Sequence, residues 1–132
     1  MEDKVEGGRN RRKSDRTDVA FTLVYSVEKP YALRISLGLV DDIDALMINL
    51  SDIGMAIISK HDLPLSTELY IKFNIIDLHL AGDNRRKHME ITGEVASNVA
   101  LPDLSHRIGI RFTKITREDQ VAISDFVKRN MG

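Results

Sequence analysis

The segment TELYIKFNI, residues 67–75, decides the fold class because apolar and polar side chains alternate along its whole length. On an extended chain, side chains two positions apart share a face. One face then carries four apolar residues and the other carries the more polar ones: Leu69, Ile71, Phe73 and Ile75 against Tyr70, Lys72 and Asn74. This pattern is typical of a strand with one face in a core, so residues 67–75 predict a half-buried β-strand.

The same period of two recurs along the chain. Clear alternation occurs in DVAFTLVYSV (residues 18–27), MEITGEV (residues 89–95) and RIGIRF (residues 107–112). Shorter apolar segments are interpreted as further strands: ALRISLGL (residues 32–39), ALMINLS (residues 45–51) and MAIIS (residues 55–59). Turn-forming residues separate these segments. Six or seven short strands at this spacing predict a small antiparallel barrel or sandwich.

The last segment, TREDQVAISDFVKRN, changes from the strand period to a helical one. Thr116 suits the N-cap position, and the two acids that follow favour the first turn of a helix. Four apolar residues form a single stripe: Ala122, Ile123, Phe126 and Val127. We expect a helix over about residues 116–130 that closes one end of the sheet.

Composition limits the class of protein. The chain has 132 residues, 19 Lys and Arg against 20 Asp and Glu, and no cysteine. This length favours one domain, and the lack of cysteine excludes disulfides and thiolate metal sites. A net charge of -1 argues against a general nucleic-acid coat. The longest apolar runs fall well short of a membrane span, so we expect a cytoplasmic protein.

The N-terminal segment concentrates positive charge. RNRRKSDR, residues 9–16, contains five basic side chains and one acid, although the whole chain is nearly neutral. Residues 1–18 carry too little apolar surface to offset the entropy lost on ordering. We therefore expect a flexible basic arm over residues 1–18 and a single folded domain over residues 19–132.

The sequence gives no positive support for an enzyme or a metal site. The four histidines are scattered, and none has the spacing of a metal ligand pair or a nucleophile beside it. Asp41, Asp42 and Asp44 are interpreted as a solvated loop, and the basic residues 85–87 as a solvated hairpin tip. We expect no catalytic residues, no cofactor and no metal.

Two short motifs carry the functional signal. The first is RxxxR at residues 12–16, with another arginine directly before it, and the second is NxSxxG at residues 49–54. Each is weak alone. In this order, and followed by the apolar strand at residues 55–59, the later strands and the C-terminal helix, they resemble the PilZ domain family over most of the chain.

This resemblance implies both a fold and a ligand. The family fold is a six-stranded antiparallel β-barrel with a C-terminal helix. The implied function is a receptor for the bacterial second messenger cyclic di-GMP. We further expect the basic arm to order over the ligand and so to change a surface that a partner protein reads. The implied ligand-binding residues come from the two motifs: Arg11, Arg12, Arg16, Asn49, Ser51 and Gly54.

The residue types suit that ligand. Arginine can read the O6 and N7 acceptors of guanine, pair with phosphate oxygens at two points and stack on a base. Asn49 and Ser51 are two apart, so we expect both on the outer face of a strand, with Ile48 and Leu50 pointing into the core. The Asn49 amide both donates and accepts, and Gly54 permits a tight turn or a close approach.

A second RxxxR occurs in the strand at residues 107–112. Arg107, Gly109 and Arg111 share its outward face, and we interpret them as a solvated face outside the site. Two alternatives to the receptor remain: a PilZ-like adaptor that does not bind nucleotide, and a small nucleic-acid-binding β-barrel. The intact motifs count against the adaptor. The near-zero net charge and the few aromatic residues, 3 Tyr and 4 Phe, count against nucleic acid.

Overall fold

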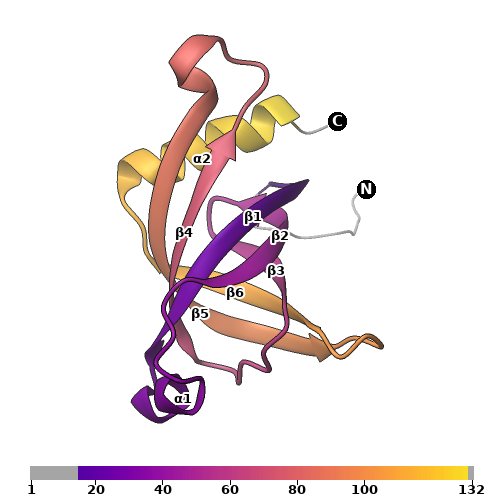
Figure 1. The fold of residues 1–132 in the computed structure, drawn as a ribbon. Helices are drawn as coiled ribbons and strands as arrows, with labels where there is room; N and C mark the ends of the chain where they lie inside the picture. Colours follow the sequence, from indigo (N-terminus) through magenta and orange to yellow (C-terminus); the bar gives the residue numbers. More distant parts are fainter. Residues whose placement is uncertain (1–14, 131–132) are drawn as a thin grey trace, which may run out of the picture.

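A computed structural model describes residues 15–130 of the chain. It contains six strands, two α-helices and one short 3-10 helix (Figure 1). In chain order the elements are β1 (Arg16–Lys29), α1 (Tyr31–Ser36), β2 (Ile43–Ser51), β3 (Gly54–Ser59), β4 (Glu68–Ile76), η1 (Gly82–Arg85), β5 (Arg86–Ala100), β6 (His106–Lys114) and α2 (Arg117–Asn130).

The six strands form one antiparallel sheet that closes on itself. The strand order is β1-β2-β3-β6-β5-β4, and β4 pairs in turn with β1, so every strand has two neighbours. The predicted six antiparallel strands and the C-terminal helix are confirmed. Closure leaves an inner face for the core and an outer wall that is available for binding.

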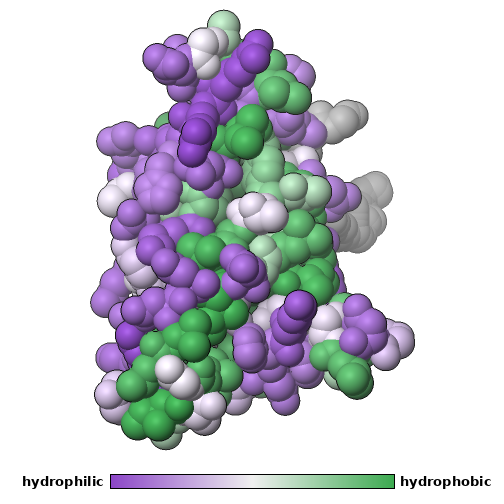
Figure 2. Space-filling view, in the orientation of Figure 1, coloured by the Kyte–Doolittle hydropathy of each residue, from purple (hydrophilic) through white to green (hydrophobic). Residues whose placement is uncertain are grey.

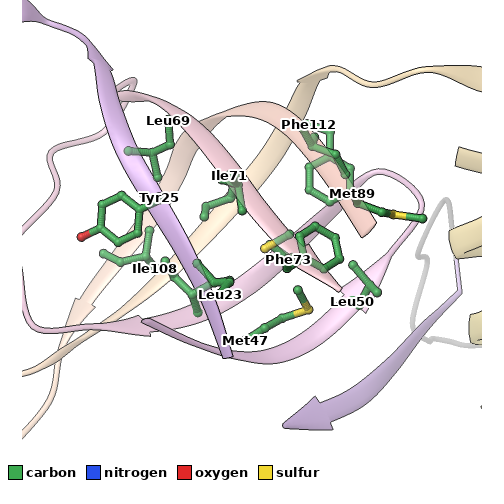
Figure 3. Close-up of a cluster of buried hydrophobic side chains, with 14 of the residues drawn as sticks. Leu23, Tyr25, Met47, Leu50, Leu69, Ile71, Phe73, Met89, Ile108 and Phe112 are labelled. Carbon is green, nitrogen blue, oxygen red and sulfur yellow. The ribbon is translucent and has the colours of Figure 1, made fainter. Parts of the chain in front are cut away.

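Alternation along the strands fills the interior. The four residues predicted to face the core in β4 are each no more than 4% exposed, which confirms the pattern of residues 67–75. Residues of β1, β2, β5 and β6 pack against them, as Figure 3 shows for the labelled cluster: Leu23, Tyr25, Met47, Leu50, Leu69, Ile71, Phe73, Met89, Ile108 and Phe112. The hydroxyl of Tyr25 lies 2.9 Å from Ser59 Oγ, so a buried hydrogen bond satisfies both groups.

The segment at residues 32–39 was predicted as a strand, and that prediction is wrong. Residues 31–36 form α1, and Leu33 and Leu37 pack against the core. These two leucines are four apart, so they fit the helical period as well as the strand period, and short apolar runs do not distinguish the two. The other side of the helix carries exposed Tyr31 and Ile35. Figure 2 shows hydrophobic surface in the region of α1.

The first strand begins three residues earlier than expected. Arg16, Thr17 and Asp18 were assigned to the arm, but they pair with the last residues of β2. Thr17 is buried, and its hydroxyl donates to the carbonyl of Asn130 at the end of α2 (3.2 Å). Backbone pairing and this contact organise a polar segment that has little apolar surface of its own.

Helix α2 packs where β1 begins and β2 ends. Its buried residues include Phe126, whose ring lies 5.8 Å from that of Phe21. The Thr116 hydroxyl accepts from the Asp119 N–H (3.1 Å), so the predicted N-cap is confirmed. Arg129 donates to buried Asp77 (2.7 Å), which joins the helix to the end of β4. Between residues 15 and 130, neither helix has the length and apolar character needed to cross a membrane.

Candidate functional site

A bulge in β2 determines how the Asn49 side chain lies. The β2–β3 ladder shifts register between Met47 and Asn49, so Met47 and Leu50 both point inward and are fully buried. Leu50 therefore faces the core as predicted, but the same prediction for half-buried Ile48 is wrong. The extra residue of a bulge changes which face of the sheet the following side chains point to, so a prediction from strict alternation is wrong around it. The Ala56 N–H donates to Asn49 Oδ1 (3.1 Å) across the bulge.

Ser51 shapes the turn between β2 and β3. Its Oγ accepts from the N–H groups of Ile53 and Gly54, both at 3.2 Å, and donates to the Gly54 carbonyl at 3.2 Å. A β-carbon at position 54 would lie 2.3 Å from the carbonyl oxygen of Ile110 in β6. The serine and glycine of the NxSxxG motif are thus required by the turn and by the close approach of β6.

These residues lie around one hollow on the outer wall. Arg16, Asn49, Ser51 and Gly54 all line it, so four of the six predicted site residues come together there. Arg11 and Arg12 lie outside the described residues. Asn49 and Ser51 are only 9% and 7% exposed, so little of either side chain is open to a ligand.

The available polar groups differ from those expected. The Asn49 amide oxygen is already bonded to the β3 backbone, so the Nδ2 group is the part of this side chain that can donate to a ligand. The Ser51 hydroxyl is occupied by the turn. Its contribution is to hold Gly54 and the β2–β3 turn in place beside the hollow.

Strand β6 contributes residues that the sequence interpretation left out of the site. Arg107, Gly109 and Arg111 line the same hollow, together with Ser97 of β5. They were interpreted as a solvated face, and the RxxxR spacing around a glycine was the signal that could have included them. Sequence alone did not show which strand lies beside β3, and the β3–β6 pairing supplies that relation.

The charge of the hollow is positive. Its lining includes Arg16, Arg107 and Arg111, and within the part of the chain that the structure describes no carboxylate lines it. Arg111 is paired with Glu94 on the adjacent strand, just outside the lining. Residues 15–130 also hold no cluster of three or more His, Asp or Glu side chains suited to a metal ion. The arrangement suits an anion with flat, hydrogen-bonding groups.

A second hollow on the β1–β4 side of the sheet has a different character. It is lined by Asp44, Lys72 and His88 among others. Lys72 pairs with Asp42 at 2.9 Å, and the hydrogen bond with this carboxylate raises the pKa of Lys72. The acids at positions 42 and 44 reduce its attraction for an anion, so the Arg16 side of the molecule is the better candidate site.

The fold and the site together define a small antiparallel β-domain with an arginine-bordered hollow on its outer wall, beside the β2–β3 turn. The chain belongs to the PilZ domain family, whose family model matches residues 10–129. This confirms the resemblance drawn from the two motifs. No curated protein sequence matches the chain.

Solved structures agree on the fold. The chain is similar to the Bacillus subtilis inhibitor of motility, MotI/DgrA, with a TM-score of 0.69 and 18% identity over 92% of this chain and 51% of that one. It is also similar to Escherichia coli YcgR in complex with c-di-GMP, with a TM-score of 0.62 and 13% identity over 90% of this chain and 45% of that one. The chain thus spans about half the length of these two proteins.

A third similar structure is the K. pneumonia MrkH–c-di-GMP complex. The TM-score is 0.60 and the identity 14%, with 91% of this chain and 52% of that chain covered. At such identities the likeness concerns the fold. The assignment of a ligand depends on the residues of this chain.

Proposed function

We propose that this protein is a receptor for cyclic di-GMP that binds the dinucleotide in the Arg16 hollow. The observation that carries the proposal is the gathering of Arg16, Asn49, Ser51 and Gly54, which come from two separate motifs, around one hollow. The similar YcgR and MrkH structures are complexes with c-di-GMP, which supports the same ligand class here.

The chemistry of the ligand matches the wall. Cyclic di-GMP carries two phosphodiester charges and two guanines, and arginine can bind both kinds of group. Asn49 Nδ2 would donate to an acceptor on a guanine edge. The glycine at position 54 lets β6, which carries Arg111, approach the β2–β3 turn, because a β-carbon there would lie 2.3 Å from the Ile110 carbonyl oxygen.

The basic residues before Arg16 would add further contacts to the bound dinucleotide. Arg11 and Arg12 are proposed to fold over the bound dianion. Each charge-assisted hydrogen bond contributes about 1.5–3 kcal/mol, whereas ordering one residue costs about 1–2 kcal/mol. Because these terms are similar, a net gain requires several arginine contacts at once, which is a physical reason for a cluster.

The output would be a changed surface. Ordering residues near Arg16 alters the start of β1, which contacts the end of α2 through Thr17 and Asn130. A partner protein that reads this region would respond to the ligand without any chemical step. The proposed role is therefore that of a cytoplasmic, non-enzymatic receptor.

Calorimetric titration with cyclic di-GMP tests this function. We expect saturable binding by the wild type and at least a tenfold weaker affinity for Arg12→Gln and Arg16→Gln, because each loses a charged two-point contact. Lys114→Gln removes the same charge from an exposed site outside the hollow and serves as the control. GTP and single-stranded DNA test selectivity.

Three outcomes have different meanings. A folded wild type that ignores cyclic di-GMP would contradict the receptor and favour the adaptor alternative. Binding of DNA with steep salt dependence, and no response to the dinucleotide, would favour the nucleic-acid alternative. Wild-type affinity in both arginine variants would remove these residues from the site.

A further inference from the structure

Three neighbouring strands contribute a floor of small residues to the hollow. Ala56 of β3 pairs with Gly109 of β6, and Gly109 pairs with Ser97 of β5. These residues therefore lie side by side across the wall, and all three line the hollow. Ala56 is only 5% exposed, and Ser97 Oγ lies 2.3 Å from the place of a β-carbon on Gly109, so the exposed part of this floor is mainly the Ser97 hydroxymethyl group. No bulky side chain projects from these three positions, which leaves space above them for a planar group.

Two arginines of β6 stand at opposite ends of this floor. Arg107 and Arg111 lie two positions before and after Gly109, so all three residues share one face of the strand. Their Cα atoms are about 13 Å apart along a strand that rises about 3.3 Å per residue. Each guanidinium can reach inward over the floor from its own end.

The two arginines have different surroundings. Arg111 pairs with Glu94 in β5, and it lies opposite Gly54 in the ladder with β3. It is therefore close to the β2–β3 turn, at the end of β2 where Ser51 pairs with Arg16. Arg107 lies opposite Ile58 and Val99, and among residues 15–130 no carboxylate forms an ion pair with it. Its guanidinium is available to a ligand that lies on the floor.

We propose that β6 supplies a second arginine pair for the dinucleotide and that one guanine lies on the Ala56–Gly109–Ser97 floor. Arg107 reads the O6 and N7 edge of this guanine, and Arg111 joins Arg16 at a phosphate. This assignment rests on the proposed function and adds residues to its site. Adenine presents an amino donor in place of O6, so Arg107 also selects guanine over adenine.

The pairing of Arg111 with Glu94 predicts competition. Glu94 accepts from Arg111 Nη2 and places a negative charge beside the guanidinium that a phosphate would bind, so it competes with the ligand for Arg111. Replacing Glu94 by glutamine removes the negative charge and keeps the size of the side chain. We expect Glu94→Gln to bind cyclic di-GMP several times more tightly than the wild type.

Titrations of the whole chain with cyclic di-GMP and cyclic di-AMP test the assignment. Arg107→Gln should weaken cyclic di-GMP binding by about tenfold or more and change cyclic di-AMP binding much less, so the preference for guanine falls. Ser97→Leu should block the floor from an exposed position and weaken binding similarly. Lys114→Gln, on the same strand but outside the hollow, should bind like the wild type.

The results separate the two proposals. If the wild type ignores cyclic di-GMP, the proposed function itself fails. If the wild type binds and Arg107→Gln and Ser97→Leu retain full affinity and full guanine preference, the floor and Arg107 are not part of the site. Unchanged affinity in Glu94→Gln would contradict competition between Glu94 and the ligand for Arg111. Thermal unfolding of each variant shows whether an affinity loss comes with loss of fold.

Discussion

Two glycines on the wall of the candidate site should respond differently to the same substitution. An added β-carbon would lie 2.3 Å from the Ile110 carbonyl oxygen at position 54, and 2.3 Å from Ser97 Oγ at position 109. The distances are equal, but the obstacles differ. A backbone carbonyl in a paired strand cannot rotate away, whereas a serine hydroxyl can adopt another rotamer.

The expected magnitudes follow from these contacts. Gly54→Ala must move β3 and β6 apart by about 0.7 Å to restore a contact of 3.0 Å, the shortest that real β-carbons show. Overpacking of this kind costs about 1–3 kcal/mol, and an obstacle in the backbone favours the upper part of that range. Gly109→Ala needs only a Ser97 rotation, so we expect it to cost less than about 1 kcal/mol.

Urea unfolding followed by circular dichroism measures both free energies of unfolding. Alanine restricts the unfolded chain in the same way at both positions, so the difference between the variants reports the folded-state contact. A difference of about 2 kcal/mol corresponds to roughly 5–8 °C in Tm for a domain of this size. Equal losses of stability in Gly54→Ala and Gly109→Ala would refute the close approach of β6 to the β2–β3 turn.

Further predictions concern the buried polar contacts. Burial disfavours the Asp77 carboxylate, but hydrogen bonds from Arg129 and a backbone N–H outweigh this effect and hold the pKa of Asp77 below its ordinary 3.8. Arg129→Gln should therefore lower the free energy of unfolding at pH 7 by about 1–3 kcal/mol in thermal or urea unfolding, because Asp77 loses its charged partner. Because folding lowers the pKa of Asp77, its ionised carboxylate stabilises the folded protein above pH 3.8. The difference in free energy of unfolding between wild type and Arg129→Gln should therefore shrink as the pH falls below that value. A constant difference down to pH 2 would contradict the ion pair. Tyr25→Phe removes a buried hydrogen bond to Ser59 and should cost about 1 kcal/mol by urea unfolding, whereas no loss would show that this bond is not stabilising.

Much of the architecture is encoded in local alternation. The pattern in residues 67–75 predicts both the strand and its buried face, since side-chain direction follows directly from period two. The helix at the C-terminal end is equally clear, because a cap and an apolar stripe agree. The segment at residues 32–39 fails this approach, since Leu33 and Leu37 fit a helix and a strand equally well.

The candidate site was only partly predictable for a different reason. The motifs located Asn49, Ser51 and Gly54. A bulge changes the side-chain direction along β2, and the local sequence does not predict this bulge. Arg107 and Arg111 were visible as a repeated spacing. Their place beside Gly54 depends on the pairing of β3 with β6, which is a long-range property of the sheet.

The most direct measurement of the central claim is an NMR titration of backbone amide signals with cyclic di-GMP. The account predicts that the largest changes fall on Arg16, Asn49 and Gly54 around the hollow, while Lys72 and His88 on the β1–β4 side change little. Changes centred on Lys72 and His88, or no changes at saturating ligand, would contradict binding at the arginine-bordered wall.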